Sequence, residues 1–552
     1  MRHPWNRRQI LGGLSLAAVL PNLACAQTVG RSTIPQAPFV EVKTTAGTVR
    51  GGTARGALAF KGIPYGGSVH GEGRFKAAPP DIPWTGVFDA TKLGPPTMQT
   101  KGSVYGEQEP AYSEDCLVLN VWTPAADNKQ RPVLVYLHGG GYAHGSAGSV
   151  AQDGGRMAAV HDVVVVACNH RLGLLGFLYL GEHLGEAYSG NAGMQDIVQS
   201  LAWIRDNIAA FGGDPGNVTV FGESGGGGKA GTVLGMPSAK GLFHKAGIAS
   251  GAARKRTPRE AAAETARRLM KALDITDARK LFDVPAQTLL ELQWAGEKGQ
   301  GGLAQPPSPP SGRAGRGFSE SLLPGRFGPV VDGHVLPADP FTDRVTDLAA
   351  DIPLLIGHTL AESRFFHMGN PAMFSLTDAG LRDHMTKDFG DWADPLIEVY
   401  RKERPNASPP DIYFAATTAR SFGTDTAVVA AMKSAQAAPV YTYRWGYWSN
   451  RSIAGADGQT LGAAHATDIG ATFYNWDQPG LLGDGPGAQA ASRHFSSFWA
   501  SFARTGKPAS PGAPDWPRYD VTSRAVMLVD ADCKVVNDPD GAARKLWEQL
   551  DG

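Results

Sequence analysis

The segment Gly222–Gly226, which reads Gly-Glu-Ser-Gly-Gly, is the feature that most restricts how this chain can fold. It follows Asn217–Phe221, a short apolar run typical of a buried strand, and it opens a stretch of small residues. Flanking glycines allow a strained turn and the close approach of neighbouring backbone, which exposes the Ser224 hydroxyl above a sheet edge. With 70 glycines in the chain, a plain glycine-rich turn is the alternative. The segment predicts a strand, a sharp turn and a helix, with a nucleophilic serine at the turn.

A glycine tract upstream of this segment is suited to binding negative charge. Arg131–Leu137 has the apolar pattern of a buried strand and leads directly into His138–Tyr142, which reads His-Gly-Gly-Gly-Tyr. The backbone N–H groups of Gly140 and Gly141, with that of Gly225, would form an oxyanion hole for an attacked carbonyl. Each such donor is typically worth about 3–4 kcal/mol in the transition state. A loop that merely turns the chain is the alternative.

Several longer motifs make the chain resemble the type-B carboxylesterases, the cholinesterase-like branch of the α/β hydrolases. Besides the tract after His138, they are Glu114–Val121, Gly190–Asp196, Asn207–Pro215 and Val218–Ser224. The resemblance covers nearly all of the mature chain. It implies an α/β-hydrolase fold, with a large, twisted and mostly parallel central sheet flanked by helices and with helical excursions over the active-site edge.

The other catalytic groups are expected after the serine, because α/β hydrolases present nucleophile, acid and histidine in that chain order. Asp351–Gly357 is typical of a late core strand, and the loop after it carries Glu362, where the family places the triad carboxylate. A solvated loop glutamate is the alternative for that residue. Gly462–Ile469 resembles the family's histidine loop and identifies His465 as the base among 14 histidines.

Three neighbouring residues are expected to support this site. Asp468 is predicted to brace the histidine loop, His138 to support the glycine tract, and Ser250 to act indirectly near the triad, with simple turn chemistry as its alternative. The residue after the nucleophile is usually alanine in the family. Here it is Gly225, in the run Gly225–Gly228. Glycines cost up to about 1 kcal/mol each inside a helix, so this helix start is either held by packing or partly mobile, and the donor is less firmly positioned.

The residues and the resemblance together imply a serine carboxylesterase that acts through an acyl-enzyme on a small-molecule ester. The chain has no His-Glu-x-x-His, Cys-x-x-Cys or phosphate-cradling motif, and no metal or organic cofactor is expected. An amidase or a lactonase with the same triad is the nearest alternative. A non-catalytic cholinesterase-like binding protein is the other, although Ser224, Glu362 and His465 are all present.

The N-terminus predicts export. Asn6–Leu11 resembles a twin-arginine signal, and the apolar run Ile10–Leu20 ends near a small-residue cleavage site at Ala24–Ala26. We therefore expect a signal peptide over residues 1–26, one α/β-hydrolase domain over 27–552, and a periplasmic or secreted protein. The alternatives are the general secretion route and a lipoprotein attached through Cys25. The apolar run is about half a membrane span, so stable membrane insertion is not expected.

Charge and cysteine content agree with this interpretation. The chain has 52 basic and 52 acidic residues, a balance that does not indicate nucleic-acid binding. After loss of Cys25, three cysteines remain, at positions 116, 168 and 533. Relatives pair the cysteine at position 116 with one in a Pro-x-Cys-x-Gln segment, which here reads Pro95–Gln99 and lacks it. No disulfide framework is expected, as suits a protein that folds before export.

The order of apolar runs predicts the layout of the domain. Strands are expected at 39–44, 58–60, 440–445 and 525–529, besides those named above. One helix is expected over 193–211, with its apolar side on the sheet. Thr257–Glu260 is interpreted as a capping box that opens a helix. Residues of about 252–350 and 365–435 are predicted to be helical, cap-like insertions over the active edge, with peripheral decoration as the alternative.

Overall fold

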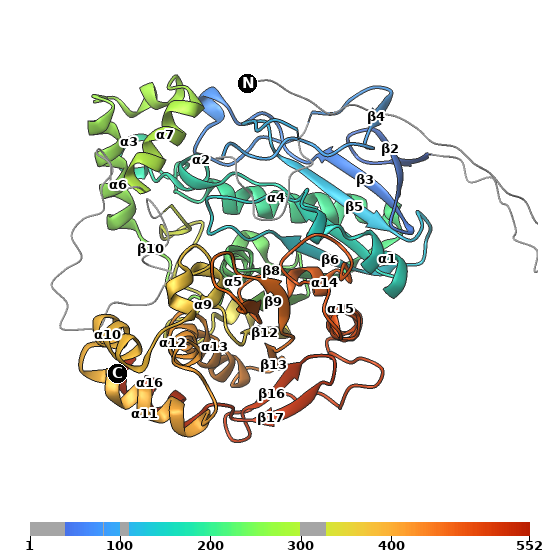
Figure 1. The fold of residues 1–552 in the computed structure, drawn as a ribbon. Coiled ribbons are helices and arrows are strands. Elements are labelled where there is room, and N and C mark those ends of the chain that lie inside the picture. The colour runs from blue at the N-terminus through green and yellow to red at the C-terminus, as the bar shows by residue number, and fades with distance from the viewer. Residues whose placement is uncertain (1–38, 81, 100–109, 298–326, 552) are drawn as a thin grey trace, which may run out of the picture. The chain divides into compact units, whose positions relative to one another are not determined.

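The computed structural model describes residues 39–80, 82–99, 110–297 and 327–551 (Figure 1). The predicted signal peptide over residues 1–26, and with it Cys25, lies outside the described residues. Within the described part of the chain, no helix has both the length and the apolar character needed to cross a bilayer.

A sheet of 13 strands forms the centre of the described chain, in the order β1-β2-β3-β5-β7-β6-β8-β9-β12-β13-β16-β17, with β4 paired to β2. Neighbours from β7 to β16 along this order are parallel, and the remaining neighbours along it are antiparallel. Strand β4 runs parallel to β2. The strands are β1 (Val40–Lys43), β2 (Thr48–Ala54), β3 (Ala57–Pro64), β4 (Val87–Asp89), β5 (Val118–Thr123), β6 (Arg131–Leu137), β7 (Val164–Cys168), β8 (Gly213–Glu223), β9 (Lys245–Ala249), β12 (Leu354–Thr359), β13 (Val440–Trp445), β16 (Ala525–Val529) and β17 (Lys534–Asn537).

The parallel part of the sheet is covered on both faces, which is why its strands are apolar throughout. Every residue of β6 is buried. Successive side chains of a strand point to opposite faces, and accordingly Val133 and Val135 belong to one core cluster while Leu134 and Tyr136 belong to another. Such a strand is stable only between two layers of helices.

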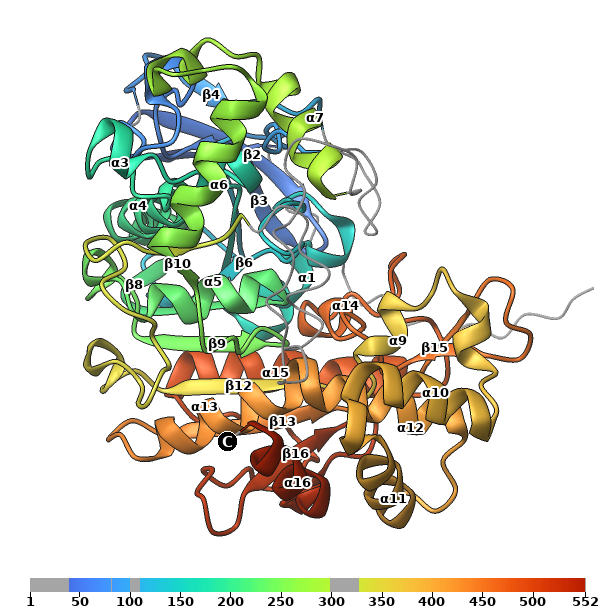
Figure 2. The same cartoon turned by 90° about the vertical axis from the view of Figure 1, so that its left-hand side faces the viewer.

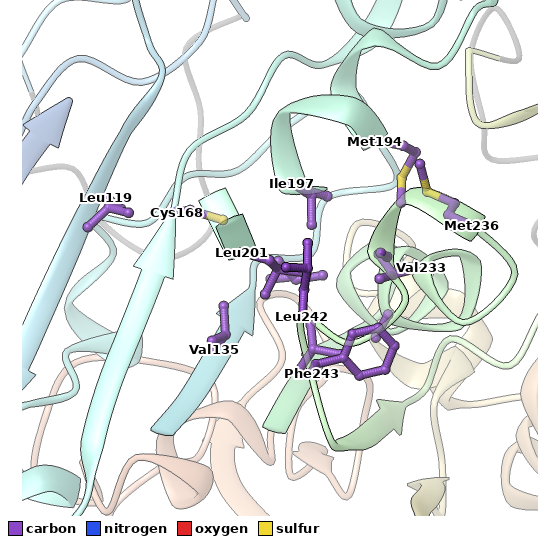
Figure 3. Close-up of a cluster of buried hydrophobic side chains, with 14 of the residues drawn as sticks. Leu119, Val135, Cys168, Met194, Ile197, Leu201, Val233, Met236, Leu242 and Phe243 are labelled. Carbon is purple, nitrogen blue, oxygen red and sulfur yellow. The ribbon is translucent and has the colours of Figure 1, made fainter. Parts of the chain in front are cut away.

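One face is covered by helices that include α4 and α5, which follow the central strands in the chain. Figure 3 shows Met194, Ile197 and Leu201 of α4 beside Val135 and Val233 in this core. The three α4 residues repeat at intervals of three and four, as an apolar helix face requires. The helices that contribute to this cluster are α2 (Gly173–Phe177), α4 (Ala192–Asn207), α5 (Gly225–Val233), α6 (Arg259–Ala272), α7 (Ala286–Glu297) and α13 (Thr424–Ser434).

The opposite face is covered mainly by α15, which buries Phe495 and Trp499 against the sheet residue Tyr443. The helices of this cluster are α1 (Gly155–His161), α10 (Asp378–Phe389), α11 (Ala393–Glu403), α12 (Pro409–Thr418), α14 (Ile469–Thr472), α15 (Ala488–Thr505) and α16 (Gly541–Asp551). The short helices α3 (Gly181–Leu184) and α9 (Ser363–Phe366) lie in connecting loops. The architecture is the predicted α/β class, a large and mostly parallel sheet flanked by helices.

The predicted excursions contain the expected helices. Residues 252–350 include α6 and α7, and residues 365–435 include α10–α13. Figures 1 and 2 show α6 and α7 in one group and α10–α12 in another group beside α16. Helix α13 packs on β12 and β13, so the second excursion also supplies part of the layer on the sheet's face.

The capping-box interpretation of Thr257–Glu260 was wrong. Thr257 and Pro258 form the short strand β10 (Thr257–Pro258), which pairs with β11 (Val330–Val331). Helix α6 begins at Arg259 with Pro258 as its N-cap, and no side chain caps it. The Thr257 N–H donates to Pro329 O at 2.9 Å, so a pairing partner more than 70 residues away outweighs the local capping pattern.

Candidate active site

The parallel register brings four loops to one edge of the sheet. Leu137 of β6 pairs with Gly222 of β8, and Ala249 of β9 pairs with both Glu223 of β8 and Gly357 of β12. The glycine tract, the serine turn, Ser250 and the loop with Glu362 all follow these paired residues. Carboxyl ends of parallel strands meet at the same edge, where α/β sheets bind their ligands.

Ser224 occupies the sharp turn that the sequence predicts between a strand and a helix. β8 ends at Glu223 and α5 begins at Gly225. Ser224 has φ 58° and ψ −126°, a strained conformation for a residue with a side chain. Its N–H donates to Ala249 O at 2.8 Å, which holds the turn against β9. Ser224 is half-buried between fully buried neighbours, so the turn presents its side chain at the surface of the sheet edge.

The glycine tract lies directly on this turn. Gly140 and Gly141 both have positive φ, 93° and 59°. A Cβ placed on Gly225 would stand 2.8 Å from Gly141 N. The N–H donors of the tract and of the first residue of α5 therefore lie close together. The alanine that is usual in the family at this position would push the tract away, whereas Gly225 permits the approach.

Packing holds the start of α5. Every residue of α5 is buried. A Cβ on Gly226 would lie 1.9 Å from Leu137 O, one on Gly227 would lie 2.6 Å from Ala249 O, and one on Gly228 would lie 2.4 Å from Tyr142 Oη. Of the two expectations for this helix start, the contacts favour support by packing. Glycine is needed at these positions because backbone atoms or the Tyr142 side chain occupy the space that a Cβ would take.

Gly226→Ala is therefore expected to destabilise the protein strongly. The new methyl group would overlap Leu137 O and approach His138 O, and neither backbone atom can move without displacing β6. Overpacking of this kind costs about 3 kcal/mol. The apparent melting temperature should fall by several degrees. In the same helix Gly231→Ala is the control, because its Cβ would meet only side-chain atoms at 3.1 Å or more and alanine favours helix. Equal melting temperatures for both variants would contradict this account.

Glu362 and His465 form a buried pair. His465 Nδ1 lies 2.6 Å from Glu362 Oε2, and the His465 N–H donates to Glu362 O at 3.3 Å. The other carboxylate oxygen accepts from the Thr359 N–H at 2.7 Å and from the Ser250 hydroxyl at 2.5 Å. Ser250 thus holds the carboxylate in place, in agreement with an indirect role. The bonds to Oε1 leave Oε2 directed at the imidazole.

Burial by itself lowers the pKa of the His465 imidazole, because it disfavours the charged form. The carboxylates of Glu223 and Glu362 outweigh this effect and raise the pKa to about 9. Burial likewise acts to raise the pKa of Glu362, but the positive charge and the hydrogen bond of His465 hold it below its ordinary value. The arrangement therefore stabilises an imidazolium beside an ionised Glu362.

Two further carboxylates, neither of which is predicted from the sequence to face the imidazole, lie close to His465. Glu223 Oε1 is 3.4 Å from His465 Nε2. Burial raises the pKa of Glu223 to about 8 and that of Asp468 to about 7. The neighbouring carboxylates add to both effects, and the positive charge of His465 opposes them. Asp468 remains predicted to brace the loop. The adjacency of Glu223 to Ser224 was the available signal, because a residue at a strand end beside the predicted nucleophile is expected to lie near the predicted base.

Glu223→Gln is expected to shift the acid limb of the pH profile of kcat/KM to lower pH by about 1 unit. Loss of a negative charge next to Nε2 makes the imidazolium less stable, so His465 becomes neutral, and able to act as a base, at lower pH. Measurements from pH 5 to 10 would follow the limb, with Glu398→Gln on the exposed side of α11 as control. An unmoved limb would show that Glu223 does not influence the base.

No hydrogen bond joins the Ser224 hydroxyl to His465 within the described chain. Instead, the serine lies beside Glu223, whose carboxylate contacts His465 Nε2. A Cβ built on Gly139 would lie 3.3 Å from Ser224 Cβ and 3.1 Å from Glu223 Oε2. The side chains of Ser224 and Glu223 therefore both lie against the glycine tract. Catalytic hydrogen bonds are often long without substrate and shorten when it binds.

Aromatic rings surround the imidazole. The ring centroids of Phe365, Phe366 and Phe422 lie 5.7, 5.0 and 5.1 Å from that of His465. Phe422 belongs to the π-helical turn η10 (Ala419–Gly423) between α12 and α13, a distortion that is frequent at functional sites. All three phenylalanines are half-buried. They give the site an apolar wall.

His138 supports the glycine tract from behind, as the sequence predicts. It is buried, its Nδ1 lies 2.9 Å from Gly139 O, and its ring stacks on that of His170 with centroids 4.6 Å apart. Burial, with the nearby Lys229, holds its pKa well below the ordinary value. A neutral, enclosed imidazole is suited to packing rather than to acting as the base.

Cys116, Cys168 and Cys533 are free thiols.

Comparison with known proteins identifies the family of this chain. The model of the carboxylesterase family matches residues 36–547. The chain is 34% identical to the para-nitrobenzyl esterase of Bacillus subtilis, over 91% of this chain and 97% of that protein. It is 32% identical to the phenmedipham hydrolase of Pseudarthrobacter oxydans, over 90% and 96%. The crystal structure of the carboxylesterase EST55 of Geobacillus stearothermophilus is similar with a TM-score of 0.75 and 35% identity, over 92% of this chain and 99% of that one. The chain therefore belongs to the carboxylesterase family of carboxylic ester hydrolases and has the α/β-hydrolase fold.

Proposed function

We propose that this protein is an exported serine carboxylesterase in which Ser224 is the nucleophile, His465 the general base and Glu362 the acid that orients it. The observation that carries the proposal is the buried 2.6 Å contact between His465 Nδ1 and Glu362, beside a serine held at φ 58° on the strand-to-helix turn. This pairing leaves Nε2 facing the side of the serine turn. The pairing of the imidazole with the carboxylate supports the roles that a serine hydrolase triad gives to these residues.

The reaction follows from these positions. His465 Nε2 takes the Ser224 proton while Oγ bonds to the ester carbonyl carbon, and the N–H groups of Gly140, Gly141 and Gly225 stabilise the resulting oxyanion. The carbon–oxygen bond to the alcohol then breaks, and His465 returns the proton to the departing oxygen. Water repeats the sequence on the acyl-enzyme and releases the acid. Glu362 and Glu223 stabilise the imidazolium that both steps form.

The apolar wall around His465 favours uncharged esters with short to medium acyl groups. Transfer of apolar substrate surface from water onto Phe365, Phe366 and Phe422 contributes about 0.8 kcal/mol per buried methylene. The relatives named para-nitrobenzyl esterase and carboxylesterase support an ester as the substrate class. Esters should react much faster than amides, because an alkoxide departs more readily than an amine.

The test is kcat/KM of the purified mature protein on matched esters, lactones and amides, with acyl groups from acetyl to palmitoyl. We expect the short and medium esters to be the best substrates. Amide rates within about tenfold of the matched ester would identify an amidase, and a preference for lactones would identify a lactonase. A rising preference for the longest chains at a lipid–water interface would identify a lipase. Absence of turnover on every substrate would favour a binding protein.

Export is the second part of the proposal and depends on Asn6–Leu11, which lies outside the described residues. The twin-arginine translocase reads the two arginines as a recognition signal. Double replacement, Arg7→Lys with Arg8→Lys, preserves charge and is expected to retain the precursor in the cytoplasm. Fractionation of a bacterial host with an intact translocase measures this. Unchanged periplasmic recovery would assign the protein to the general secretion route.

The exported protein should begin at Gln27, as mass spectrometry can determine. A lipid-modified Cys25 at the N-terminus would instead identify a membrane-anchored enzyme.

A further inference from the structure

Lys229 is a fully buried lysine that the proposed reaction does not use. It lies in α5, one turn after the residues that touch the glycine tract, and its exposed fraction is 0%. Among the described residues it forms no ion pair with a carboxylate. Burial of an amine without a counterion is costly. A buried lysine of this kind is therefore a candidate for a function.

The Lys229 amino group contacts the glycine tract at both ends. Nζ donates a hydrogen bond to His138 O at 2.9 Å, at the start of the tract. It also lies 5.6 Å from the ring centroid of Tyr142, at the end of the tract, within the range of a cation–π contact. Gly140 and Gly141, the two donors of the tract, lie between these anchor points.

Tyr142 needs such support because its backbone is strained. It has φ 64°, which is uncommon for a residue with a bulky side chain. The Gly173 N–H donates to its carbonyl at 2.7 Å, and its ring packs edge-on against Phe177. With Lys229 on the ring and Gly228 beneath the hydroxyl, the end of the tract is enclosed on several sides.

Lys229 and the glycines belong to one face of α5. Gly225 and Gly226 are the residues whose Cβ atoms would strike Gly141 and Leu137, and Lys229 follows them at i+4 and i+3. Residues at these spacings share a helix face. The glycines let the tract approach the helix, and the long side chain on the same face reaches over it to His138 O.

Burial lowers the pKa of Lys229 to about 7, with Cys168 opposing the effect. The amine and the ammonium both carry N–H groups, so the hydrogen bond to His138 O is available in either state.

We propose that Lys229 is a positioning residue of the oxyanion hole: its amino group anchors His138 and Tyr142 and thereby fixes the N–H groups of Gly140 and Gly141 at the place where the oxyanion forms. The inference rests on the proposed function, since it concerns the same Ser224 chemistry. Misplacement of catalytic groups by about 1 Å reduces rates by about 100-fold. Lys229 acts through the tract and does not touch the substrate.

The test compares Lys229→Met with Lys433→Met. Lys433 of α13 is also buried, and its Nζ donates to Ala349 O at 2.7 Å and to Gln436 Oε1 at 2.8 Å. Ala349 precedes β12, at the end of that strand opposite to Glu362. Each variant removes a buried amine from a backbone carbonyl, but only Lys229→Met does so at the glycine tract. Melting temperature and circular dichroism give the folded fraction of each.

We expect Lys229→Met to lower kcat by about 100-fold with KM within about twofold of the wild type, and Lys433→Met to leave both constants unchanged. A trifluoromethyl ketone provides the second readout. The Ser224 oxygen adds to its carbonyl carbon, the serine proton passes to His465, and the carbonyl oxygen becomes an oxyanion in the hole. Its inhibition constant should rise by the same factor as kcat falls. Equal ketone affinity in wild type and Lys229→Met would overturn the proposal.

Tyr142→Leu provides an independent test if Lys229→Met does not fold. It removes the ring under Nζ and keeps the hydrogen bond to His138 O, so kcat and ketone affinity should again fall together at constant KM. Unchanged ketone affinity in that variant would also overturn the proposal. The proposed function fails separately, by ester turnover that survives loss of Ser224, whereas normal ketone affinity in a Ser224-dependent enzyme contradicts only the role of Lys229.

Discussion

Replacement of Ser224 by alanine is expected to lower kcat for ester hydrolysis by about a million-fold while leaving the fold intact. Without Oγ no acyl-enzyme forms, and only the oxyanion hole and substrate binding remain to accelerate attack by water. The fold should survive because Ser224 makes its structural contact through the backbone, where its N–H donates to Ala249 O at 2.8 Å. His465→Ala should cause a loss of similar size, since the serine is a weak nucleophile without its base.

Single-turnover and steady-state kinetics on a chromogenic aryl ester measure this loss. The double variant should be no slower than either single variant, because residues of a triad act as a unit. Ser501→Ala in α15, where the hydroxyl donates to Lys507 O, is a matched control that should keep normal turnover. Substantial activity of folded Ser224→Ala, after exclusion of contaminating esterase, would contradict the assignment of the nucleophile.

Glu362→Gln is expected to reduce kcat by about ten-thousand-fold. The Thr359 N–H and the Ser250 hydroxyl both donate to Oε1, so a glutamine would direct its amide oxygen to them and its NH₂ group to His465 Nδ1. An NH₂ donor there selects the tautomer with the proton on Nε2, and that tautomer cannot accept the Ser224 proton. The shape of the site is retained, but the base is in the wrong form.

A pH–rate profile of Glu362→Gln would distinguish this effect from misfolding, with Glu398→Gln as the charge-matched control on the surface. Loss of the adjacent negative charge also lowers the pKa of His465, so the residual activity should extend to lower pH than in the wild type. A near-normal rate would assign the orienting acid to another carboxylate, with Asp468 and Glu223 as the candidates that the structure offers.

The sequence by itself determined the strands and turns that carry the site. Arg131–Leu137 and Val440–Trp445 were predicted with the bounds that the structure has, and the serine turn was predicted between β8 and α5. These features are local, because apolar runs and flanking glycines define backbone conformation over a few residues. Predicted end points were less accurate elsewhere. β8, for example, begins at Gly213 rather than Asn217.

Glu362 and His465 were identified through the family resemblance, because nothing local distinguishes a loop glutamate or one histidine among 14. The structure brings these two residues to 2.6 Å although 103 positions separate them. Backbone hydrogen bonds between segments far apart in the sequence hold the two loops together: the Ala361 N–H donates to Ala463 O at 2.8 Å, and the His465 N–H donates to Glu362 O at 3.3 Å.

Tertiary structure alone decided the electrostatics and the close packing. The contact of Glu223 with His465, the burial of Lys229 against His138 O, and the fit of Gly225 against Gly141 each join segments from different strands. The pairing of Thr257 with Val330 likewise replaced a local capping pattern. Charge and burial depend on all neighbours in space, whereas a sequence pattern reports only neighbours along the chain. For that reason the strands and local turns were predictable here, and the pKa values and the contact of Lys229 with the glycine tract were not.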